Sequence, residues 1–323
     1  MTYKYIIIFL LSFISTYILI PKIIKIGCRF NYIDSPDTRK KHKRNIVRIG
    51  GLGIFIGLLG SSLFALFLGW IPEDKIQLFL ITQISSCLYF FIGFLDDLFS
   101  VSFLKRLLLQ VLAAVFIWSQ GIQINKLDFS ALFGNGTTYS LPIFISLFLT
   151  VVWIVGVTNS FNWLDGLDGL SCGVALISSL CFLLLFSSYS TNLEQFLIIA
   201  LAGACLGFLN FNYYPARIFM GDGGSYLLGS NLALFSIYSH QFFINNNINQ
   251  LSFLYPVLIL FIPLGDMSCV VFSRIFEGKL PFFPDRKHLH YRLLNLGISH
   301  RNTVLIFYFF SILLSSLALF CLP

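Results

Sequence analysis

Residues 141–170 read LPIFISLFLTVVWIVGVTNSFNWLDGLDGL. The first part, 141–158, is almost entirely apolar, and about 20 such residues cross the hydrocarbon core of a bilayer as a helix. The segment that begins at Asn159 carries two amides and two carboxylates but no basic side chain. The stretch therefore predicts a spanning helix that leads to a polar, acidic segment at one membrane surface.

The composition of the chain also indicates a membrane protein. Of 323 residues, 57% are apolar and 11% are charged, whereas a soluble domain carries about 25% charged residues. In a soluble protein, the excess of 21 Lys and Arg over 14 Asp and Glu would suggest nucleic acid binding. In a membrane protein such an excess marks the cytoplasmic loops. We predict an all-α integral membrane protein with no nucleic-acid partner.

Ten segments are candidates for spanning helices, and eleven is the alternative number. They cover residues 3–21, 49–70, 76–95, 105–121, 141–158, 170–188, 194–211, 224–240, 251–272 and 302–321. We expect them to form a single polytopic transmembrane domain over residues 1–323.

The loops on one side of these spans carry most of the charge. This side comprises residues 22–48, 96–106, 159–169, 212–223 and 273–301. It holds 18 of the 21 Lys and Arg, and nine of the 14 acidic residues. The positive-inside rule makes this side cytoplasmic. Carboxylates at a membrane boundary are costly and usually functional, so we expect an active-site cleft that faces the cytoplasm.

The third span ends in an acidic pair, Asp96 and Asp97. Adjacent carboxylates repel each other unless a cation or a proton lies nearby. Beside a divalent metal, such a pair can bind the ion or deprotonate a phosphate or hydroxyl nucleophile. A solvated helix end is the simpler alternative, but apolar residues flank the pair on both sides.

The segment 159–170 carries the second acidic group. If it is helical, Asn162 shares a face with Asp165, and Asp165 shares one with Asp168. The two Asp-Gly steps favour instead a turn, or backbone that a ligand approaches closely. A purely structural loop rarely places two amides and two acids between apolar helices, so we expect a binding role.

The third group is the sequence NYYPARIFMGDGGS at 212–225. Asp222 is a hard oxygen ligand suited to Mg²⁺ or Mn²⁺. The glycines after it open the eighth span, and their free backbone N–H groups could hold a phosphate. Phe219 offers a stacking face for a base. Taken alone, GDGGS is equally compatible with a capping turn.

Two basic segments lie on the same side. Residues 284–292, PDRKHLHYR, combine Lys and Arg with two imidazoles, which suits a phosphate clamp. Zinc at His288 and His290, or a merely topogenic loop, are the alternatives. The run RKKHKR at 39–44 could bind anionic lipid head groups. From this region we single out His42 and Arg48 as candidate substrate-binding residues.

Together, these motifs resemble those of the polyprenyl-phosphate N-acetylhexosamine-1-phosphate transferases, the MraY/WecA superfamily of glycosyltransferase family 4. Five motifs occur in family order over essentially the whole chain: RKKHKRNIVRIGG, GFLDD, NSFNWLDGLDGL, NYYPARIFMGDGGS and PFFPDRKHLHYRLLNLG. The resemblance implies a Mg²⁺-dependent transferase, with Mn²⁺ as the alternative ion. A polyprenyl phosphate would attack the β-phosphate of a UDP-N-acetylhexosamine and release UMP. Direct attack is favoured over an aspartyl intermediate.

The resemblance also implies residue roles. Asp96 and Asp97 match the catalytic acidic pair, and Asn162 and Asp222 match the metal-ligating positions. Positions around the nucleotide sugar are matched by Asn159, Asp165, Asp168, Asn212 and Phe219, with Phe219 beside the uracil. Arg106 stands where the family usually has Lys. The basic loop that contacts the pyrophosphate is matched by His288, His290 and Arg292.

The motif DRKHLHYR is similar to the WecA/TagO-type branch, which implies UDP-N-acetylglucosamine as donor and undecaprenyl phosphate as acceptor. Tyr291 departs from the second His usual there, so N-acetylfucosamine, N-acetylquinovosamine and muramoyl-pentapeptide donors stay as alternatives. The resemblance implies a bacterial inner-membrane enzyme that initiates cell-envelope polysaccharide synthesis, with a homodimer as one expected form. A cation-coupled transporter is the alternative from another class, although Asp266 is the only acid deep within a predicted span.

Overall fold

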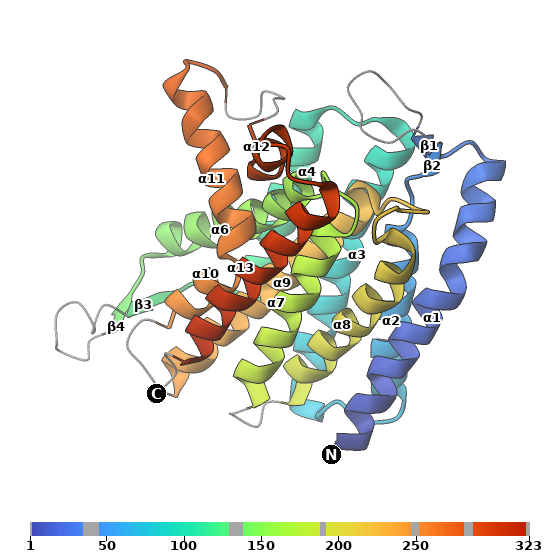
Figure 1. Cartoon of the computed structure of the whole chain (residues 1–323). Helices are drawn as coiled ribbons and strands as arrows, with labels where there is room; N and C mark the ends of the chain where they lie inside the picture. The colour runs from blue at the N-terminus through green and yellow to red at the C-terminus, as the bar shows by residue number, and fades with distance from the viewer. Residues whose placement is uncertain are drawn as a thin grey trace.

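The computed structural model describes residues 2–34, 45–128, 138–187, 192–246, 252–280 and 287–320. Within these ranges it is a helical bundle with two short β-hairpins (Figure 1). The helices are α1 Thr2–Arg29, α2 Gly51–Phe67, the 3-10 helix η1 Glu73–Lys75, α3 Ile76–Phe99, α4 Phe103–Ser119, α6 Ile143–Leu164, α7 Leu170–Ser187, α8 Asn192–Asn212, α9 Gly221–Asn245, α10 Leu254–Ile259, α11 Phe261–Phe276, α12 Leu289–Asn295 and α13 His300–Phe320. The antiparallel strand pairs are β1 Ile33–Asp34 with β2 Ile46–Val47, and β3 Lys126–Asp128 with β4 Thr138–Ser140.

The helical fold class is confirmed, and helices lie at all ten predicted span positions. Among the described residues, six helices are long and apolar enough to cross a membrane by themselves, namely α1, α3, α6, α7, α8 and α13. They make the chain a multi-pass membrane protein. The helices α2, α4 and α11 have only 16 or 17 residues, so the total of ten spans stays a prediction.

The predicted span 251–272 is not one helix but two, α10 and α11, which meet at Leu260. The sequence already contains the reason, because Pro263 lacks the N–H that would bond the carbonyl of Ile259. Ser178 Oγ donates a hydrogen bond to that carbonyl at 3.3 Å. A neighbouring helix thus satisfies the freed backbone group, as a protein interior within a membrane requires.

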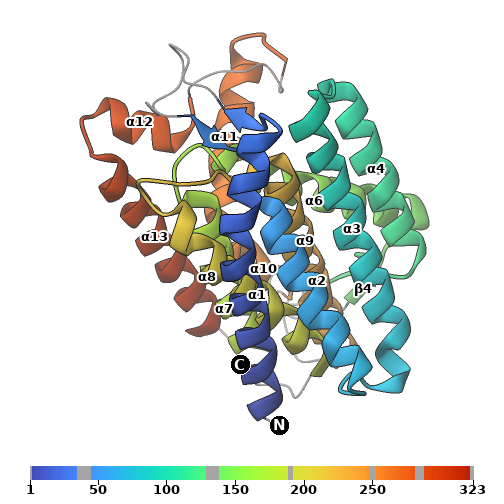
Figure 2. The same cartoon turned by 90° about the vertical axis from the view of Figure 1, so that its right-hand side faces the viewer.

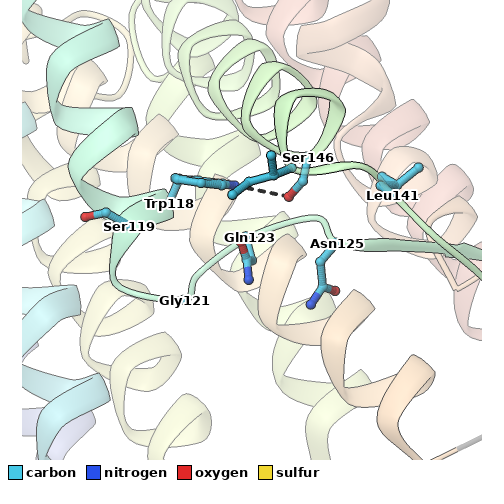
Figure 3. A pocket seen from close by; sticks show the side chains of 8 residues that line it. Trp118, Ser119, Gly121, Gln123, Asn125, Leu141 and Ser146 are labelled. Carbon is cyan, nitrogen blue, oxygen red and sulfur yellow. Dashed lines mark hydrogen bonds between the residues drawn. The ribbon is translucent and has the colours of Figure 1, made fainter.

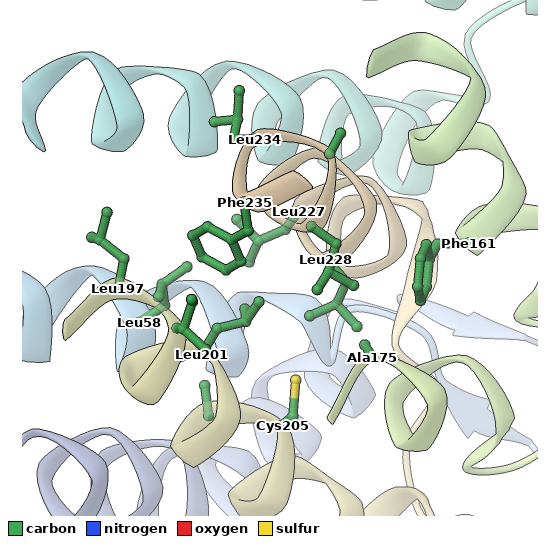
Figure 4. Close-up of a cluster of buried hydrophobic side chains, with 14 of the residues drawn as sticks. Leu58, Phe161, Ala175, Leu197, Leu201, Cys205, Leu227, Leu228, Leu234 and Phe235 are labelled. Atoms are coloured by element: carbon green, nitrogen blue, oxygen red, sulfur yellow. The ribbon is translucent and has the colours of Figure 1, made fainter. Parts of the chain in front are cut away.

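Helix α9 lies at the centre of the bundle, against α2, α3, α6 and α7. Every residue from Gly223 to His240 is buried. In Figure 4, Leu227 and Phe235 of α9 face Leu58 of α2 and Leu201 of α8. Because protein surrounds α9, the helix can carry serines and amides that lipid-facing helices avoid.

One end of the bundle collects the segments that carry the predicted site residues. The ends of α3 and α6, the starts of α4 and α9, and α12 all lie there, whereas both chain termini lie at the other end (Figures 1 and 2). Val47 of β2 forms a parallel bridge with Ile218, and the N–H of Phe219 donates to the carbonyl of Val47 at 2.8 Å. The segment before α2 is thereby joined to the segment before α9.

Candidate active site

Asp96, Arg106 and Asp222 form the centre of a polar cluster at this end. Arg106, in the first turn of α4, donates from Nη1 to Asp96 Oδ2 at 2.5 Å and to Asp222 Oδ2 at 2.7 Å. A cation between two carboxylates offsets their repulsion. The structure therefore brings together acids that lie 126 positions apart in the sequence, and it connects them through Arg106.

Asn162 joins this cluster from the last turn of α6. Its Nδ2 donates to Asp222 Oδ1 at 2.9 Å and to Ser225 Oγ at 3.0 Å. The two residues predicted to ligate a metal are thus in direct contact. Their role as ligands stays a prediction.

The donor set of the cluster fits a hard divalent cation. Asp96 and Asp222 supply carboxylate oxygens and Asn162 supplies an amide oxygen, which are the ligands that Mg²⁺ prefers. The guanidinium between the carboxylates shows that this position favours positive charge. No group of three or more His, Cys, Asp or Glu is placed to hold a metal in the described part of the chain. A metal here would therefore need Asn162 and oxygens from the substrate.

Asp97 has different surroundings from its neighbour Asp96. Its Oδ1 accepts hydrogen bonds from Arg48 Nη2 at 3.0 Å and from the N–H of Asp222 at 2.9 Å, and its Oδ2 accepts one from the N–H of Gly223 at 2.9 Å. The side chain is 1% exposed. Asp97 therefore caps the N-terminus of α9, although it belongs to α3. The prediction of a phosphate on free N–H groups here is wrong for Gly223, whose N–H already has an acceptor.

Gly93 allows α3 to approach the start of α9. A Cβ atom on Gly93 would lie 2.2 Å from the carbonyl oxygen of Asp222. We expect Gly93→Ala to displace this turn and destabilise the fold by about 1–3 kcal/mol, a typical cost of overpacking. The measurement is the melting temperature of the purified protein in detergent.

Gly60→Ala is the matched control for that substitution. Gly60 also lies inside a helix, but a Cβ atom there would meet nothing within 4 Å. Because Ala favours a helix over Gly by about 1 kcal/mol, the control should melt at the same or a higher temperature. Equal melting temperatures for the two variants would contradict the close approach at Gly93.

The turn between α6 and α7 is fastened to the segment before α9. Helix α6 ends at Leu164, so Asp168 lies in a turn and not on a helix face. Its Oδ2 accepts the N–H of Ala216 at 3.0 Å, and the N–H of Gly169 donates to Asn212 Oδ1 at 3.0 Å. Asp168 and Asn212, both predicted to bind the nucleotide sugar, hold two loops together in this structure.

Asp165 lies in the same turn, beside the acidic cluster. Burial, together with the charges of Asp222, Asp97 and Asp168, raises the pKa of Asp165 well above its ordinary value. The charges add to the effect of burial because these carboxylates lie near one another at this end of the bundle. A bound cation would offset their repulsion.

The two histidines of the basic loop form a wall against this turn. A Cβ atom on Gly166 would lie 2.4 Å from His290 Nε2, so the imidazole packs directly on the glycine backbone. The rings of His288 and His290 lie nearly parallel, with their centroids 5.4 Å apart. The ring of Trp163 meets His288 edge-on at 5.7 Å. The imidazoles therefore pack on Trp163 and Gly166, at the end of α6 that also carries Asn162.

The remaining predicted residues differ in their placement. Arg292 is exposed and donates from Nε to the carbonyl of Lys287 at 2.7 Å. Asn159 donates to Gln110 Oε1 at 2.6 Å, which joins α6 to α4. Phe219 is half-buried in the segment before α9. His42 lies outside the described residues.

Asp266 and Arg274 are not among the predicted site residues. Both are buried on one face of α11, at a spacing of eight residues that corresponds to about two helical turns. The guanidinium of Arg274 lies 4.8 Å from the ring centroid of Trp163, and Asp266 bonds His288. The sequence did contain one signal for Asp266, because a carboxylate inside an apolar span is by itself a candidate functional residue.

A pocket of about 310 Å³ lies away from these residues, where α4 ends and α6 begins (Figure 3). Trp118 Nε1 donates to Ser146 Oγ at 3.1 Å in its wall. Ser146 precedes Asn162 by 16 residues on α6, which is about 24 Å along a helix axis. None of the predicted site residues lines this pocket.

Comparison with known proteins gives consistent matches. The family model described as Glycosyl transferase family 4 matches residues 79–240. The probable undecaprenyl-phosphate N-acetylglucosaminyl 1-phosphate transferase of Bacillus subtilis (strain 168) is 31% identical over 97% of this chain and 83% of its own length. The undecaprenyl-phosphate alpha-N-acetylglucosaminyl 1-phosphate transferase of Thermotoga maritima is 33% identical over 89% of this chain and 81% of its own. The protein of that name from Escherichia coli (strain K12) is 27% identical over 91% and 77%.

Proposed function

The chain belongs to glycosyl transferase family 4, and on this premise we propose that it transfers N-acetylglucosamine-1-phosphate from UDP-N-acetylglucosamine to a polyprenyl phosphate. An oxygen of the lipid phosphate attacks the β-phosphorus of the donor. The bond from that phosphorus to the bridging oxygen breaks, and UMP leaves with the bonding electrons. The products are UMP and a polyprenyl-diphospho-sugar.

The observation that carries this proposal is the cluster of Asp96, Arg106, Asn162 and Asp222 at one end of a membrane bundle. Three anionic phosphate groups must meet in this reaction, so positive charge is needed to offset their repulsion. The cluster provides Arg106 and an oxygen donor set for a divalent cation, and two imidazoles pack on the same end of α6. No bond to carbon changes, so positioning and electrostatics suffice.

We assign Mg²⁺, or alternatively Mn²⁺, to Asp222 and Asn162, with Asp96 close by. The ion would supply Lewis-acid stabilisation of the diphosphate oxygens. Asp96 would keep the attacking phosphate deprotonated. Arg106 would then exchange a carboxylate partner for a phosphate oxygen, since a guanidinium donates charge-assisted hydrogen bonds to both kinds of group.

The names of the relatives support the choice of substrates, because they specify N-acetylglucosamine as the sugar and undecaprenyl phosphate as the lipid. Donors with N-acetylfucosamine, N-acetylquinovosamine or muramoyl-pentapeptide are not favoured. We infer that the cluster faces the cytoplasm, because the loops at that end carry most of the Lys and Arg. The bacterial inner membrane as the location stays a prediction. A homodimer stays a prediction.

The transporter alternative has little to support it. It relied on a carboxylate deep in the membrane, but Asp266 is engaged with His288 and the backbone of Leu289. The acids that gather together lie at one end of the helices, whereas transporter sites lie near the midplane.

The experiment is a transfer assay with purified protein, radiolabelled UDP-N-acetylglucosamine, undecaprenyl phosphate and Mg²⁺. We expect stoichiometric UMP and labelled lipid, and a lower rate with a panel of other UDP-sugars. Absence of both products with every sugar of the panel would refute the proposed function.

Chelation tests the metal assignment separately. We expect excess EDTA to abolish turnover and added Mg²⁺ or Mn²⁺ to restore it, because both ions take oxygen ligands. Mn²⁺ binding to the lipid-free protein in the presence of UDP-N-acetylglucosamine, followed by its electron paramagnetic resonance signal, should weaken at least tenfold in Asn162→Ala. Full turnover in EDTA, or unchanged Mn²⁺ binding by the variant, would contradict the assignment.

A further inference from the structure

Asp266 is a buried carboxylate for which the reaction as described has no use. It lies in α11, 1% exposed, at a depth where an unpaired charge is costly. Its Oδ2 lies 2.7 Å from His288 Nδ1, and its Oδ1 accepts the N–H of Leu289 at 2.6 Å. Both oxygens are therefore directed at the start of α12.

The hydrogen bond fixes which nitrogen of His288 carries a proton. A carboxylate only accepts hydrogen bonds, so Nδ1 must be the donor. The second ring nitrogen, Nε2, lies on the opposite side of the imidazole from Asp266. Among the residues that the structure describes, Nε2 has no hydrogen-bond partner.

The rest of the ring is also held in place. His288 is 7% exposed, stacks on His290, and meets the ring of Trp163 at its edge. Arg274 packs on Trp163, and it comes from the same face of α11 as Asp266. Helix α11 thus supports both sides of the contact between His288 and Trp163, next to Asn162.

The geometry points to Asp266 as a positioning residue that makes His288 a fixed cationic donor to the diphosphate of the donor substrate. The inference rests on the proposed function. A diphosphate accepts hydrogen bonds, and Asp266 also accepts one. An imidazole that bridges the two must donate from both nitrogens, and it then carries a positive charge. Asp266 stabilises that charge from the side that faces away from the substrate.

The competing explanation is structural, since Asp266 also accepts the first N–H of α12. Asp266→Asn separates the two roles. The amide oxygen can still accept the N–H of Leu289, but the side chain no longer provides the charge that stabilises an imidazolium. We expect a similar melting temperature and a loss of about 100-fold in kcat/KM for UDP-N-acetylglucosamine, the low end for a positioned proton-bearing group.

Substitutions of His288 provide the test of coupling. His288→Asn keeps a donor near the position of Nδ1 and removes Nε2, so it should fold normally and lose about 100-fold in kcat/KM. Asp266→Asn added to His288→Asn should cost no more than about threefold further, because residues that act through each other are not additive. Multiplied losses in the double variant would overturn the inference.

Glu194→Gln is the control for loss of a buried carboxylate. Glu194 is 6% exposed and binds Lys75 at the other end of the bundle. We expect a lower melting temperature with kcat/KM of the folded protein unchanged. If Asp266→Asn behaves in the same way, the role of Asp266 is structural and the inference is wrong. An inactive wild type would refute the proposed function instead. In that case the positioning role is tested by calorimetry, which measures the affinity of the same variants for UDP-N-acetylglucosamine.

Discussion

Asp222→Asn is expected to reduce UMP release by about 1,000-fold or more while the protein stays folded. The substitution keeps the size of the side chain. The amide oxygen can accept from only one of the two donors, Asn162 Nδ2 or Arg106 Nη1, but the side chain is 22% exposed, so water can pair with the other donor. What it removes is one negative charge at the centre of the cluster. Loss of one preorganised electrostatic group typically costs 100- to 1,000-fold in rate, and loss of metal affinity adds to it.

The measurement for Asp222→Asn is turnover at saturating donor and acceptor, with the melting temperature as the check on folding. Asp74→Asn makes the same chemical change at an exposed position in η1, away from the cluster, and should leave turnover unchanged. An Asp222→Asn enzyme that keeps more than a tenth of wild-type turnover would remove Asp222 from the reaction.

The sequence allowed the helices and the charged end to be predicted because both depend on local composition. An apolar run such as 141–158 must be a helix in a bilayer, since unpaired backbone groups are too costly there. The break at Leu260 was also encoded locally, in Pro263. The partners of α9 were not, because a helix covered by protein on all sides gives no periodic signal of which neighbour covers which face.

The different roles of Asp96 and Asp97 could not be predicted from the sequence. Asp96 and Asp97 are chemically identical and adjacent, so no pattern distinguishes them. Successive residues of a helix point about 100° apart. That rotation places Asp96 beside Arg106 and Asp97 against the backbone of Asp222 and Gly223. The distinction depends on how α3 packs on α9, which the sequence does not state.

The contacts of Asp168 and Asn212 could not be predicted from the sequence either. Asp168 and Asn212 were predicted to surround the nucleotide sugar, yet in the structure they accept backbone N–H groups of neighbouring segments. Polar residues beside glycines are expected both at binding sites and in turns that need side-chain acceptors. Only tertiary contacts tell which backbone groups those side chains satisfy.

Asp97→Asn is expected to lose both stability and turnover, unlike Asp222→Asn. Asp97 accepts hydrogen bonds from Arg48 and from two backbone N–H groups, and its side chain is 1% exposed. An amide offers one acceptor oxygen, and its NH₂ group would face either Arg48 or the N–H of Gly223, both of which are donors. A buried donor left without an acceptor costs about 1–3 kcal/mol.

The consequence for turnover follows from position, because Asp97 holds the backbone of Asp222 itself. Release of that turn would move Asp222 relative to Asp96 and Arg106, and a displacement of about 1 Å at a reacting group can cost 100-fold in rate. We therefore expect a lower melting temperature for Asp97→Asn, and at least a 100-fold loss of turnover in the fraction that remains folded. Asp96→Asn is the matched comparison, since its carboxylate contacts Arg106 and no N–H of α9. It should lose turnover with little change in melting temperature. If the two variants melt alike, the assignment of Asp97 as the cap of α9 is wrong.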